Sequence, residues 1–458
     1  MKELYYTKHG RREFLRAAGY GIALSALPRI SFASNSNPDV VVIGAGSAGL
    51  SATAELISKG KSVICIEAMN RIGGRCYTDN TTFGVPYDVG AHWLHGYSSN
   101  QLAEYGKKQK DIFNIYKDHD DSYRVYDGKK DLVWPEDKPL WDLYKKIKNI
   151  ASNATKDVPL IDLIPENLKK NEWFGSVQKI LKSRDFENQT VFDDKLNWRD
   201  PGEGDGFCTQ GYGTLLAHYR KDIPVKLNTI ANEIKWSGKD IKVETNNGTI
   251  TAKACIVTVS TGVLNAGKIK FTPDLPKKKY EAFDGINMTP YHRVTLQLKE
   301  NFYRDYGISA DTYWYKKVEN NYLNKEPYPK SSNGTLRVCH SNISFFSLKG
   351  QFAKDMAKEG DKASIDFILN YLRSVYGSSF DNYFIKAHVS DWIDNPYTVG
   401  AWSGAKPGKS KLRKILKKSV QNKIFFAGEA TAGAYGTVHG ADRSGKRVVK
   451  ELLKKVKI

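Results

Sequence analysis

Residues 39–75 constrain the fold more than any other part of the sequence, because they have the pattern of a complete nucleotide-binding unit. Residues 40–43 are a run of β-branched side chains, which is typical of a strand buried on both faces. Residues 48–59 have helical composition, and residues 62–66 form a second apolar strand that ends at Glu67. The order of strand, tight turn, helix and strand predicts a Rossmann-like α/β unit.

Three glycines follow the first strand at the spacing GxGxxG. Gly44 permits a sharp turn off the strand, Gly46 lets the backbone approach a pyrophosphate, and Gly49 lets the helix pack close to the sheet. The helix N-terminus then faces the phosphates with free N–H groups. Glu67 ends the second strand, where it can accept hydrogen bonds from ribose hydroxyls. These residues predict a bound dinucleotide, either NAD or FAD.

The chain has 458 residues and 40% apolar content, enough for two domains with substantial cores. Its formal net charge is +20, but lysines are scattered, and only residues 446–457 form a compact lysine-rich segment. This pattern favours a solvated basic surface over a nucleic-acid partner. The five cysteines show no CxxC pair and no metal-ligand spacing, so we expect no metal site and buried free thiols at Cys65 and Cys255.

Residues 1–33 have the pattern of a targeting segment. Residues 10–16 contain the twin arginines Arg11 and Arg12, an apolar run follows at residues 17–27, and residues 31–33 form a small-residue cleavage site. The apolar run is too short to cross a bilayer, which needs about 20 residues. We therefore expect transient contact with the twin-arginine (Tat) export machinery, a periplasmic or secreted location, and no integral membrane span.

Directly after the ribose-binding acid, the chain reads Arg71-Ile72-Gly73-Gly74-Arg75. Two glycines and an arginine form a loop that can close over a pyrophosphate, with Arg75 as its charge partner. Together with GxGxxG and Glu67, this RxGGR segment resembles the FAD-binding fingerprint of the flavin-containing amine oxidase family. Many members of that family carry arginine two places after the acid, where this chain has Met69.

The resemblance implies a Rossmann-like FAD-binding domain built from discontinuous segments, combined with an α+β substrate domain. Residues 38–97, 211–286 and 391–458 are assigned to the FAD-binding domain. Residues 98–210 and 287–390 are assigned to the substrate domain, and the first of these is rich in lysine and in amphipathic helical patterns, for example at residues 139–150 and 172–183.

Further FAD contacts are implied by the resemblance. They are Gly74 in the loop, Ile230 near the adenine after a strand expected at 225–227, Trp392 beside the flavin, Glu429 near the pyrophosphate and ribityl chain, and the backbone of Val438 at the pyrimidine edge. The final helix, expected over 438–453, would point its positive end at flavin O2. The covalent-flavin cysteine of monoamine oxidases would fall at Ala401, so FAD is expected to be noncovalent.

The family's substrate site falls on four residues of this chain. His95, in the segment Gly90-Ala91-His92-Trp93-Leu94-His95-Gly96, is a candidate contact of a substrate amine in the polyamine oxidase branch. Arg293 stands where the family usually has a lysine held by water against flavin N5. Trp402 is the first aromatic wall position beside the flavin, and Thr437 is the second, where a missing tyrosine widens the cleft for a long substrate.

The implied activity is oxidation of an amine, with polyamines or acetylated polyamines favoured, in an exported bacterial enzyme. Hydride passes from the carbon beside a neutral amine to flavin N5, the imine is hydrolysed, and O₂ reoxidises the flavin to give H₂O₂. A polycationic substrate opposes the positive charge of the chain, so we expect acidic residues in the cleft, for example Glu203 and Asp205.

Two alternatives stay open. An L-amino-acid oxidase or another flavin oxidoreductase of the same fold would use Arg293 to hold a carboxylate. A non-catalytic basic flavoprotein would bind nucleic acid or anionic surfaces. The sequence does not decide which amine is oxidised, whether O₂ or another acceptor is used, or the oligomeric state.

Overall fold

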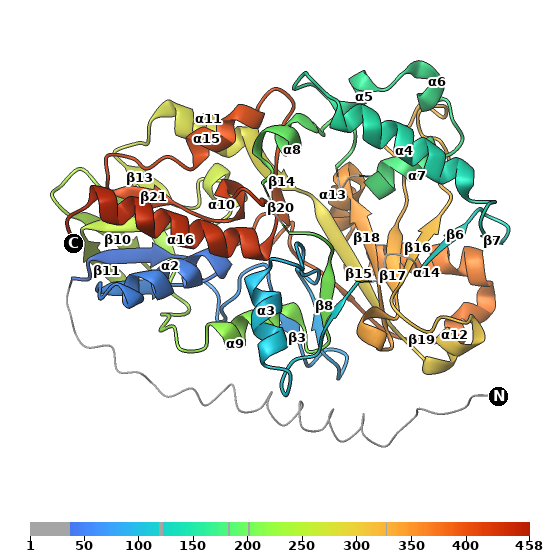
Figure 1. Ribbon diagram of the computed structural model, residues 1–458, viewed down its shortest axis with the longest axis horizontal. Coiled ribbons are helices and arrows are strands. Elements are labelled where there is room, and N and C mark those ends of the chain that lie inside the picture. The colour runs from blue at the N-terminus through green and yellow to red at the C-terminus, as the bar shows by residue number, and fades with distance from the viewer. Residues whose placement is uncertain (1–36, 119–121, 182–183, 200–201, 327) are drawn as a thin grey trace.

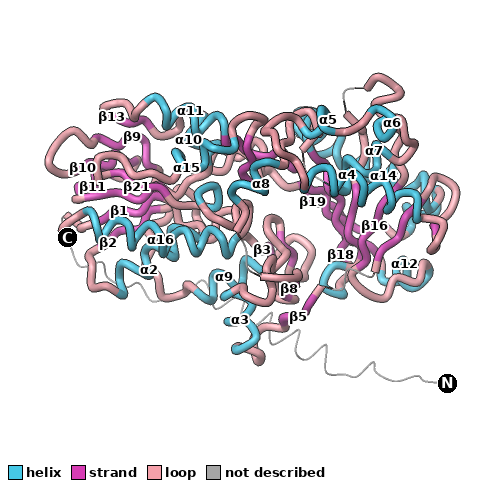
Figure 2. Tube along the Cα trace, turned by 45° about the horizontal axis from the view of Figure 1, so that its top comes forward, coloured by secondary structure: helices cyan, strands magenta, loops and turns pink. Residues whose placement is uncertain are grey.

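The computed structural model describes residues 37–118, 122–181, 184–199, 202–326 and 328–458 (Figure 1). The signal sequence predicted at residues 1–33 lies outside them. Within the described residues, most strands gather in two groups at opposite ends of the molecule, as Figure 2 shows. One group contains the glycine turn, and the other is the large sheet of the second half.

A parallel sheet of four strands forms the centre of the first half. Its order is β2-β1-β12-β21, with β1 at Val40–Ile43, β2 at Val63–Ile66, β12 at Ala254–Val257 and β21 at Ile424–Phe426. These strands come from three widely separated parts of the chain. Their side chains are almost all apolar because both faces of the sheet are covered.

The two faces of this sheet are covered by different layers. Val40 and Val42 pack towards α2 (Ser47–Ser58) and α16 (Val438–Lys455), which lie side by side (Figure 1). Val41 and Ile43, on the opposite face, pack towards a second sheet. Helix α16 approaches α2 so closely that a Cβ atom at Gly445 would lie 2.4 Å from the carbonyl oxygen of Ala48.

The second sheet has the order β11-β10-β9-β13, with β9 at Ala231–Lys235, β10 at Ile241–Thr245, β11 at Gly248–Ala252 and β13 at Lys270–Thr272. A hairpin turn at Asn247 and Gly248 joins β10 to β11. The strand predicted at 225–227 is wrong. Only Lys226 pairs there, with Ile66, because the chain turns away at Asn228, whose φ is +51°.

A sheet of seven strands forms the second half. Its order is β19-β15-β18-β17-β16-β6-β7, with β6 at Tyr123–Tyr126, β7 at Asp131–Leu132, β15 at Tyr291–Leu298, β16 at Thr312–Lys316, β17 at Asn333–Leu336, β18 at Ile343–Lys349 and β19 at Phe384–Val389. Val294 and Leu296 face one side, where α13 (Gly350–Glu359) and α14 (Asp361–Tyr376) cover them. Arg293 alternates with them and therefore faces the other side.

Short elements connect the halves. The strand pairs are β3 (Thr78–Asp79) with β4 (Tyr87–Asp88), β5 (Ile115–Lys117) with β8 (Gly206–Cys208), and β14 (Ile286–Thr289) with β20 (Trp402–Ala405). The remaining helices are α3 (Gln101–Lys108), α4 (Lys138–Ser152), α5 (Leu160–Leu163), α6 (Glu166–Lys169), α7 (Phe174–Leu181), α8 (Phe192–Asn197), α9 (Tyr212–Tyr219), α10 (Thr261–Asn265), α11 (Lys277–Gly285), α12 (Glu300–Asp305), α15 (Arg413–Leu416) and the 3₁₀ turns η1 (Val338–His340), η2 (Ser378–Asn382), η3 (Ser410–Leu412) and η4 (Glu429–Thr431).

The predicted fold class is confirmed: a Rossmann-like domain assembled from discontinuous segments stands beside an α+β domain. The helices predicted at 139–150 and 438–453 correspond to α4 and α16, and the one predicted at 172–183 corresponds to α7, which begins at Phe174. The domain boundaries stay a prediction. Among the described residues, no helix combines the length and the apolar character that a bilayer crossing requires.

Candidate active site

One cavity of 1160 Å³ joins the two halves. It begins at the glycine turn, where Gly44 and Glu67 line it, and reaches His95 and Trp402 on the side of the seven-stranded sheet. Drug-sized ligands occupy pockets of about 300 to 1,000 Å³. This cavity therefore has room for a dinucleotide and a second, smaller molecule.

The glycine turn leaves the backbone open to the cavity. Gly44 has a φ of +102°, and a Cβ atom at Gly49 would lie only 1.8 Å from the carbonyl oxygen of Gly44. Gly46 is the residue before α2, and its backbone bridges to Gly73. Gly74 crosses close by, because a Cβ there would lie 3.4 Å from the Cα of Gly46. Two glycine segments thus form a cradle at the N-terminus of α2 that fits a pyrophosphate.

Glu67 stabilises this turn and also lines the cavity. Its carboxylate accepts hydrogen bonds from the amide of Ala45 at 2.7 Å and from the amide of Met69 at 3.0 Å. Burial raises the pKa of Glu67, while these two amides oppose that shift. A carboxylate has about four acceptor positions, so two remain for ribose hydroxyls. Ile230 lines the same end, and its own amide donates to Asn246 Oδ1 at 2.7 Å.

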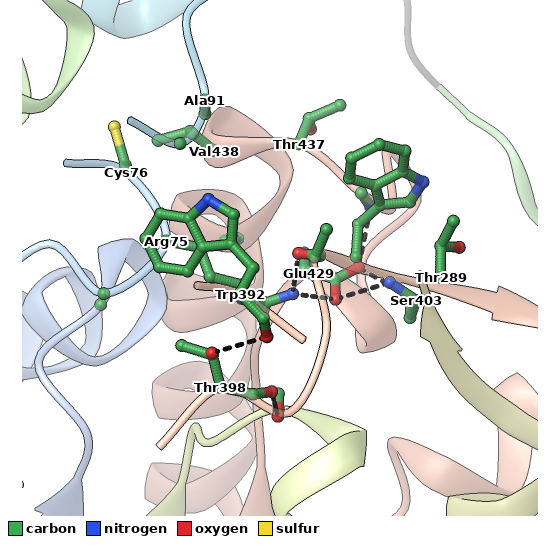
Figure 3. A pocket seen from close by; sticks show the side chains of 18 of the residues that line it. Arg75, Cys76, Ala91, Thr289, Trp392, Thr398, Ser403, Glu429, Thr437 and Val438 are labelled. Atoms are coloured by element: carbon green, nitrogen blue, oxygen red, sulfur yellow. Dashed lines mark hydrogen bonds and ion pairs between the residues drawn. The ribbon is translucent and has the colours of Figure 1, made fainter. Parts of the chain in front are cut away.

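Arg75 and Glu429 form an ion pair of 2.9 Å beside the cavity (Figure 3). Glu429 also accepts hydrogen bonds from the amide and hydroxyl of Ser403 and from the amide of Gly436. Burial alone would raise the pKa of Glu429, but Arg75 and Ser403 hold the pKa below its ordinary value. Arg75 also donates to the carbonyl of Ala401 at 2.8 Å and lines the cavity, and its contact with a phosphate stays a prediction.

Trp392 anchors the chain at residues 89–90. Its indole N–H donates to the carbonyl of Val89 at 3.0 Å. A Cβ atom at Gly90 would lie 3.0 Å from the ring of Trp392 and 1.9 Å from the carbonyl oxygen of Arg75, so there is no space for a side chain. The carbonyl of Trp392 accepts a hydrogen bond from the hydroxyl of Thr398 (Figure 3). Trp392 therefore holds residues 89–90 at the cavity wall, and its contact with a flavin stays a prediction.

Thr437 has a capping role that its sequence position did not suggest. Its hydroxyl accepts a hydrogen bond from the amide of Gly440 at 3.0 Å and donates to the carbonyl of Ala434 at 2.7 Å. It is the N-cap of α16, whose first residue is Val438. Its neighbour Gly436 lies against Trp402, because a Cβ there would lie 3.6 Å from the indole ring. Thr437 and Trp402 both line the cavity, and the place of Thr437 as the second wall position stays a prediction.

The aromatic wall contains a second ring that the sequence analysis missed. Tyr291 packs against Trp402, with ring centroids 4.9 Å apart, and shares a hydrogen bond with Ser347. Its position two residues before Arg293 in β15 places both side chains on the cavity face of the sheet. That alternation was the signal by which Tyr291 could have been found.

Arg293 holds the segment that passes the cavity at residues 88–92. Its guanidinium donates to the carbonyls of Asp88 at 2.8 Å and Gly90 at 2.9 Å, and to Nδ1 of His92 at 3.0 Å. Burial, and then the charge of Arg293, lower the pKa of His92, so its ring is neutral and accepts at Nδ1. Burial also raises the pKa of the Asp88 side chain to about 6. Both terminal nitrogens of the Arg293 guanidinium, Nη1 and Nη2, thus donate hydrogen bonds to protein atoms.

The far part of the cavity carries a histidine–carboxylate pair. Nδ1 of His95 lies 2.8 Å from Oδ1 of Asp205, and both side chains line the cavity. Trp93 stands between this pair and the sheet, and its indole donates to the hydroxyl of Tyr313 at 3.0 Å. Of the two acids expected in the cleft, Asp205 is present, whereas Glu203 is not among the lining residues.

The residues present fit a flavin dinucleotide: a glycine cradle for the pyrophosphate, a carboxylate for the ribose and the N-terminus of α16 all line one cavity. These features define a flavin-dependent oxidoreductase. The chain belongs to the family of flavin containing amine oxidoreductases, whose sequence pattern matches residues 165–453, and residues 42–108 match an NAD(P)-binding Rossmann-like domain.

Relatives over nearly the whole chain carry related names. Probable polyamine oxidase 4 of Arabidopsis thaliana is 29% identical over 448 residues, covering 90% of this chain and 86% of that protein. Polyamine oxidase 4 of Oryza sativa subsp. japonica is 26% identical over 472 residues, covering 94% and 91%. The solved structure of cyclohexylamine oxidase from Brevibacterium oxydans IH-35A has a TM-score of 0.71 at 17% identity, covering 91% of this chain and 99% of that one.

Proposed function

We propose that this protein is an exported oxidase that binds FAD noncovalently and oxidises a polyamine or an acetylated polyamine, with O₂ as the acceptor. The observation that carries this proposal is the single cavity that runs from the glycine cradle to Trp402 and on to the His95–Asp205 pair. The names of the relatives, polyamine oxidases of two plants, support the same substrate class.

When bound, the flavin supplies the hydride acceptor N5 and is reoxidised by O₂ to give H₂O₂, so that the amine leaves as an imine that water hydrolyses. The chain supplies orientation. Trp402 and Tyr291 offer adjoining ring faces to an aliphatic chain and exclude water from its reacting carbon.

His95 is proposed to bind an amine of the substrate. When Asp205 accepts the Nδ1–H of His95, the Nε2 atom carries the lone pair and accepts an amine N–H. Asp205 also places a negative charge beside that amine, which offsets the positive charge of the chain locally.

The test begins with the visible absorption spectrum of the purified protein, with and without spermine under anaerobic conditions. We expect a flavin spectrum that spermine bleaches. Acid precipitation should release the flavin into the supernatant; flavin that stays with the pellet would contradict noncovalent binding.

Steady-state assays of H₂O₂ release should then compare spermine, N-acetylspermine, a monoamine and an L-amino acid. Activity on amino acids alone would overturn the polyamine assignment in favour of an amino-acid oxidase. Absence of turnover with every amine, together with salt-sensitive DNA binding, would favour a non-catalytic basic flavoprotein.

Export is proposed from residues 1–33 alone. Changing Arg11 and Arg12 together to lysine should leave the protein in the cytoplasmic fraction of a Tat-competent bacterium, whereas the unchanged chain reaches the periplasm. Equal distribution of the two proteins would contradict a twin-arginine signal.

A further inference from the structure

The wall of the cavity on the side of the second half is made by alternate residues of four neighbouring strands. Its rows follow the strand register: Tyr291 pairs with Lys349, and Arg293 pairs with Ser347 in the next row. Phe345 lies one row further, beside Thr335 and Tyr313, and all of these residues line the cavity. Lys349 therefore marks one end of this wall, and Tyr313 marks the other.

The two ends of the wall carry different groups, a carboxylate near Tyr313 and the amino group of Lys349. Tyr313 receives the hydrogen bond of Trp93, which stands next to the His95–Asp205 pair. Lys349 lies four residues from Phe345 along β18, which corresponds to about 14 Å at about 3.4 Å per residue. The resemblance to the family implies that Arg293 contacts the flavin. Arg293 lies in the row between those of Lys349 and Phe345. A long substrate along this wall would thus have one end near a carboxylate and the other near an ammonium group.

Lys349 has few partners. Its Nζ atom donates to the carbonyl of Lys179 at 3.0 Å, and within the described part of the chain no carboxylate lies within 4 Å of it. The nearby Asp185 is engaged elsewhere: it lies 3.7 Å from Nζ of Lys179 and accepts the amide of Gln351. Burial, and then the charge of Lys179, lower the pKa of Lys349 to about 7. An ammonium group in such surroundings gains from an added acceptor.

Arg184 adds a second positive charge at this end. It is buried, it lines the cavity, and its guanidinium donates to Thr289 Oγ1 at 2.8 Å and to the side chain and backbone of Asn287. Two carboxylates line the cavity near Arg184, and both already have partners. Asp193 forms an ion pair with Arg413, and Asp194 accepts a hydrogen bond from Tyr435. The local field therefore disfavours a substrate ammonium and favours an oxygen acceptor.

We infer that Lys349, supported by Arg184, forms a subsite for an oxygen acceptor at the end of the substrate, either an acyl carbonyl or a carboxylate, and that this subsite discriminates against a free terminal ammonium. The inference rests on the proposed function and narrows it: the substrate is an amine with one cationic end and one acylated or anionic end. Lys349 is a specificity-determining residue in this role.

The test compares three substrates with the same spermine backbone: free spermine, N-acetylspermine, and an analogue in which an isopropyl group replaces the acetyl group. This propyl compound keeps the branched outline of the acetyl group, but it lacks the oxygen and keeps the terminal nitrogen as an ammonium. For the unchanged protein, we expect kcat/KM to be at least tenfold higher with N-acetylspermine than with either of the others. An analogue with a carboxylate in place of the acetamide should be oxidised as well. Its kcat/KM, compared with that of N-acetylspermine, shows which oxygen acceptor the subsite prefers.

Lys349→Met should reduce the preference for acetyl over propyl about tenfold, and Lys349→Glu should favour free spermine over N-acetylspermine. Lys358→Met is the matched control, because Lys358 is an exposed lysine of the neighbouring helix α13; it should keep the preference. If the Lys349 variants fail to fold, the ratio of kcat/KM for the acetyl compound to that for the propyl compound, measured on the unchanged protein, still tests the subsite.

Equal kcat/KM for the acetyl and propyl compounds in both the unchanged protein and Lys349→Met would overturn the inference while the proposed function stands. Failure to oxidise any of the three would overturn the proposed function. The subsite is then tested by thermal shift, where N-acetylspermine should raise Tm more than the propyl compound does, and Lys349→Met should remove the difference. Equal shifts would overturn the subsite as well.

Discussion

At the glycine turn, backbone atoms border the cavity. The amide of Gly73 donates to the carbonyl of Ala45 at 2.9 Å, and the packing at Gly49 excludes even a methyl group. Where the two halves meet, buried charged side chains make the contacts instead. Arg413 makes three hydrogen bonds to the carboxylate of Asp193, and Arg293 donates to the carbonyls of Asp88 and Gly90. The glycine turn depends on the absence of side chains, whereas the contact between the halves depends on which side chains are present. A substitution should therefore act differently in these two regions.

The largest effect is expected for Gly49→Ala. The added methyl group would lie 1.8 Å from the carbonyl oxygen of Gly44, so β1 and α2 must move apart. Overpacking typically costs about 1 to 3 kcal/mol, and a clash with backbone exceeds that range. We expect little soluble protein and no bound flavin, measured by expression and by absorbance. Ala54→Ser, at a partly exposed position of the same helix, should behave as the unchanged protein. A soluble, flavin-bearing Gly49→Ala variant would contradict the backbone account.

Arg413→Met tests the contact between the two halves. Removing one member of a buried ion pair leaves an unpaired charge, at a cost of about 3 to 5 kcal/mol. Asp193 would lose all three hydrogen bonds from Arg413, so the free energy of unfolding should fall by about that amount, measured by urea denaturation. Lys414→Met, one residue later and exposed, is the control. A loss as small as that of the control would show that this charged pair does not stabilise the contact between the halves.

Gly46→Ala should weaken flavin binding without changing the stability of the fold. The added methyl group would meet only the carbonyl oxygen of Gly73, at 4.0 Å, and the φ of −72° suits alanine. The chain should fold with an unchanged Tm in its flavin-free form, but the methyl group occupies the space where a pyrophosphate approaches. Flavin affinity should fall by about tenfold to 100-fold, or about 1.4 to 2.8 kcal/mol, in a titration of the flavin-free protein. Unchanged affinity would place the pyrophosphate elsewhere.

Of the four substitutions, Arg293→Lys should cause the smallest change in free energy, here a change in stability. A lysine ammonium is a compact point charge and cannot reach both carbonyls and His92 as the planar fork does. We expect a loss of about 1 to 2 kcal/mol. The rate at which O₂ restores flavin absorbance in stopped-flow experiments should rise, because a freed ammonium can face the flavin. An unchanged or slower rate would count against the position of Arg293 opposite N5.

The difference between the halves also explains how far the sequence could be interpreted. The nucleotide-binding unit lies within 39–75, and its glycines have one physical reason each, so β1, α2 and β2 could be predicted closely. Lys349 and Arg184 line the cavity only because of strand register and of packing between residues distant in sequence. No local pattern marks such residues. The partner of Arg75 was missed for the same reason, since Glu429 is 354 positions away.

The close packing of α16 on α2 at Gly445 and Ala48 also sets the order in which this protein can mature. Strand β1 is synthesised before the other described strands, but its sheet lacks β21, and α2 lacks its neighbour α16, until residues 424–455 have been synthesised. The strands of the second half, between residues 123 and 389, are complete earlier. Domains generally fold as units during synthesis. The nucleotide-binding domain, although it begins first, is therefore the last to close, and its cofactor site is complete only once α16 has been synthesised.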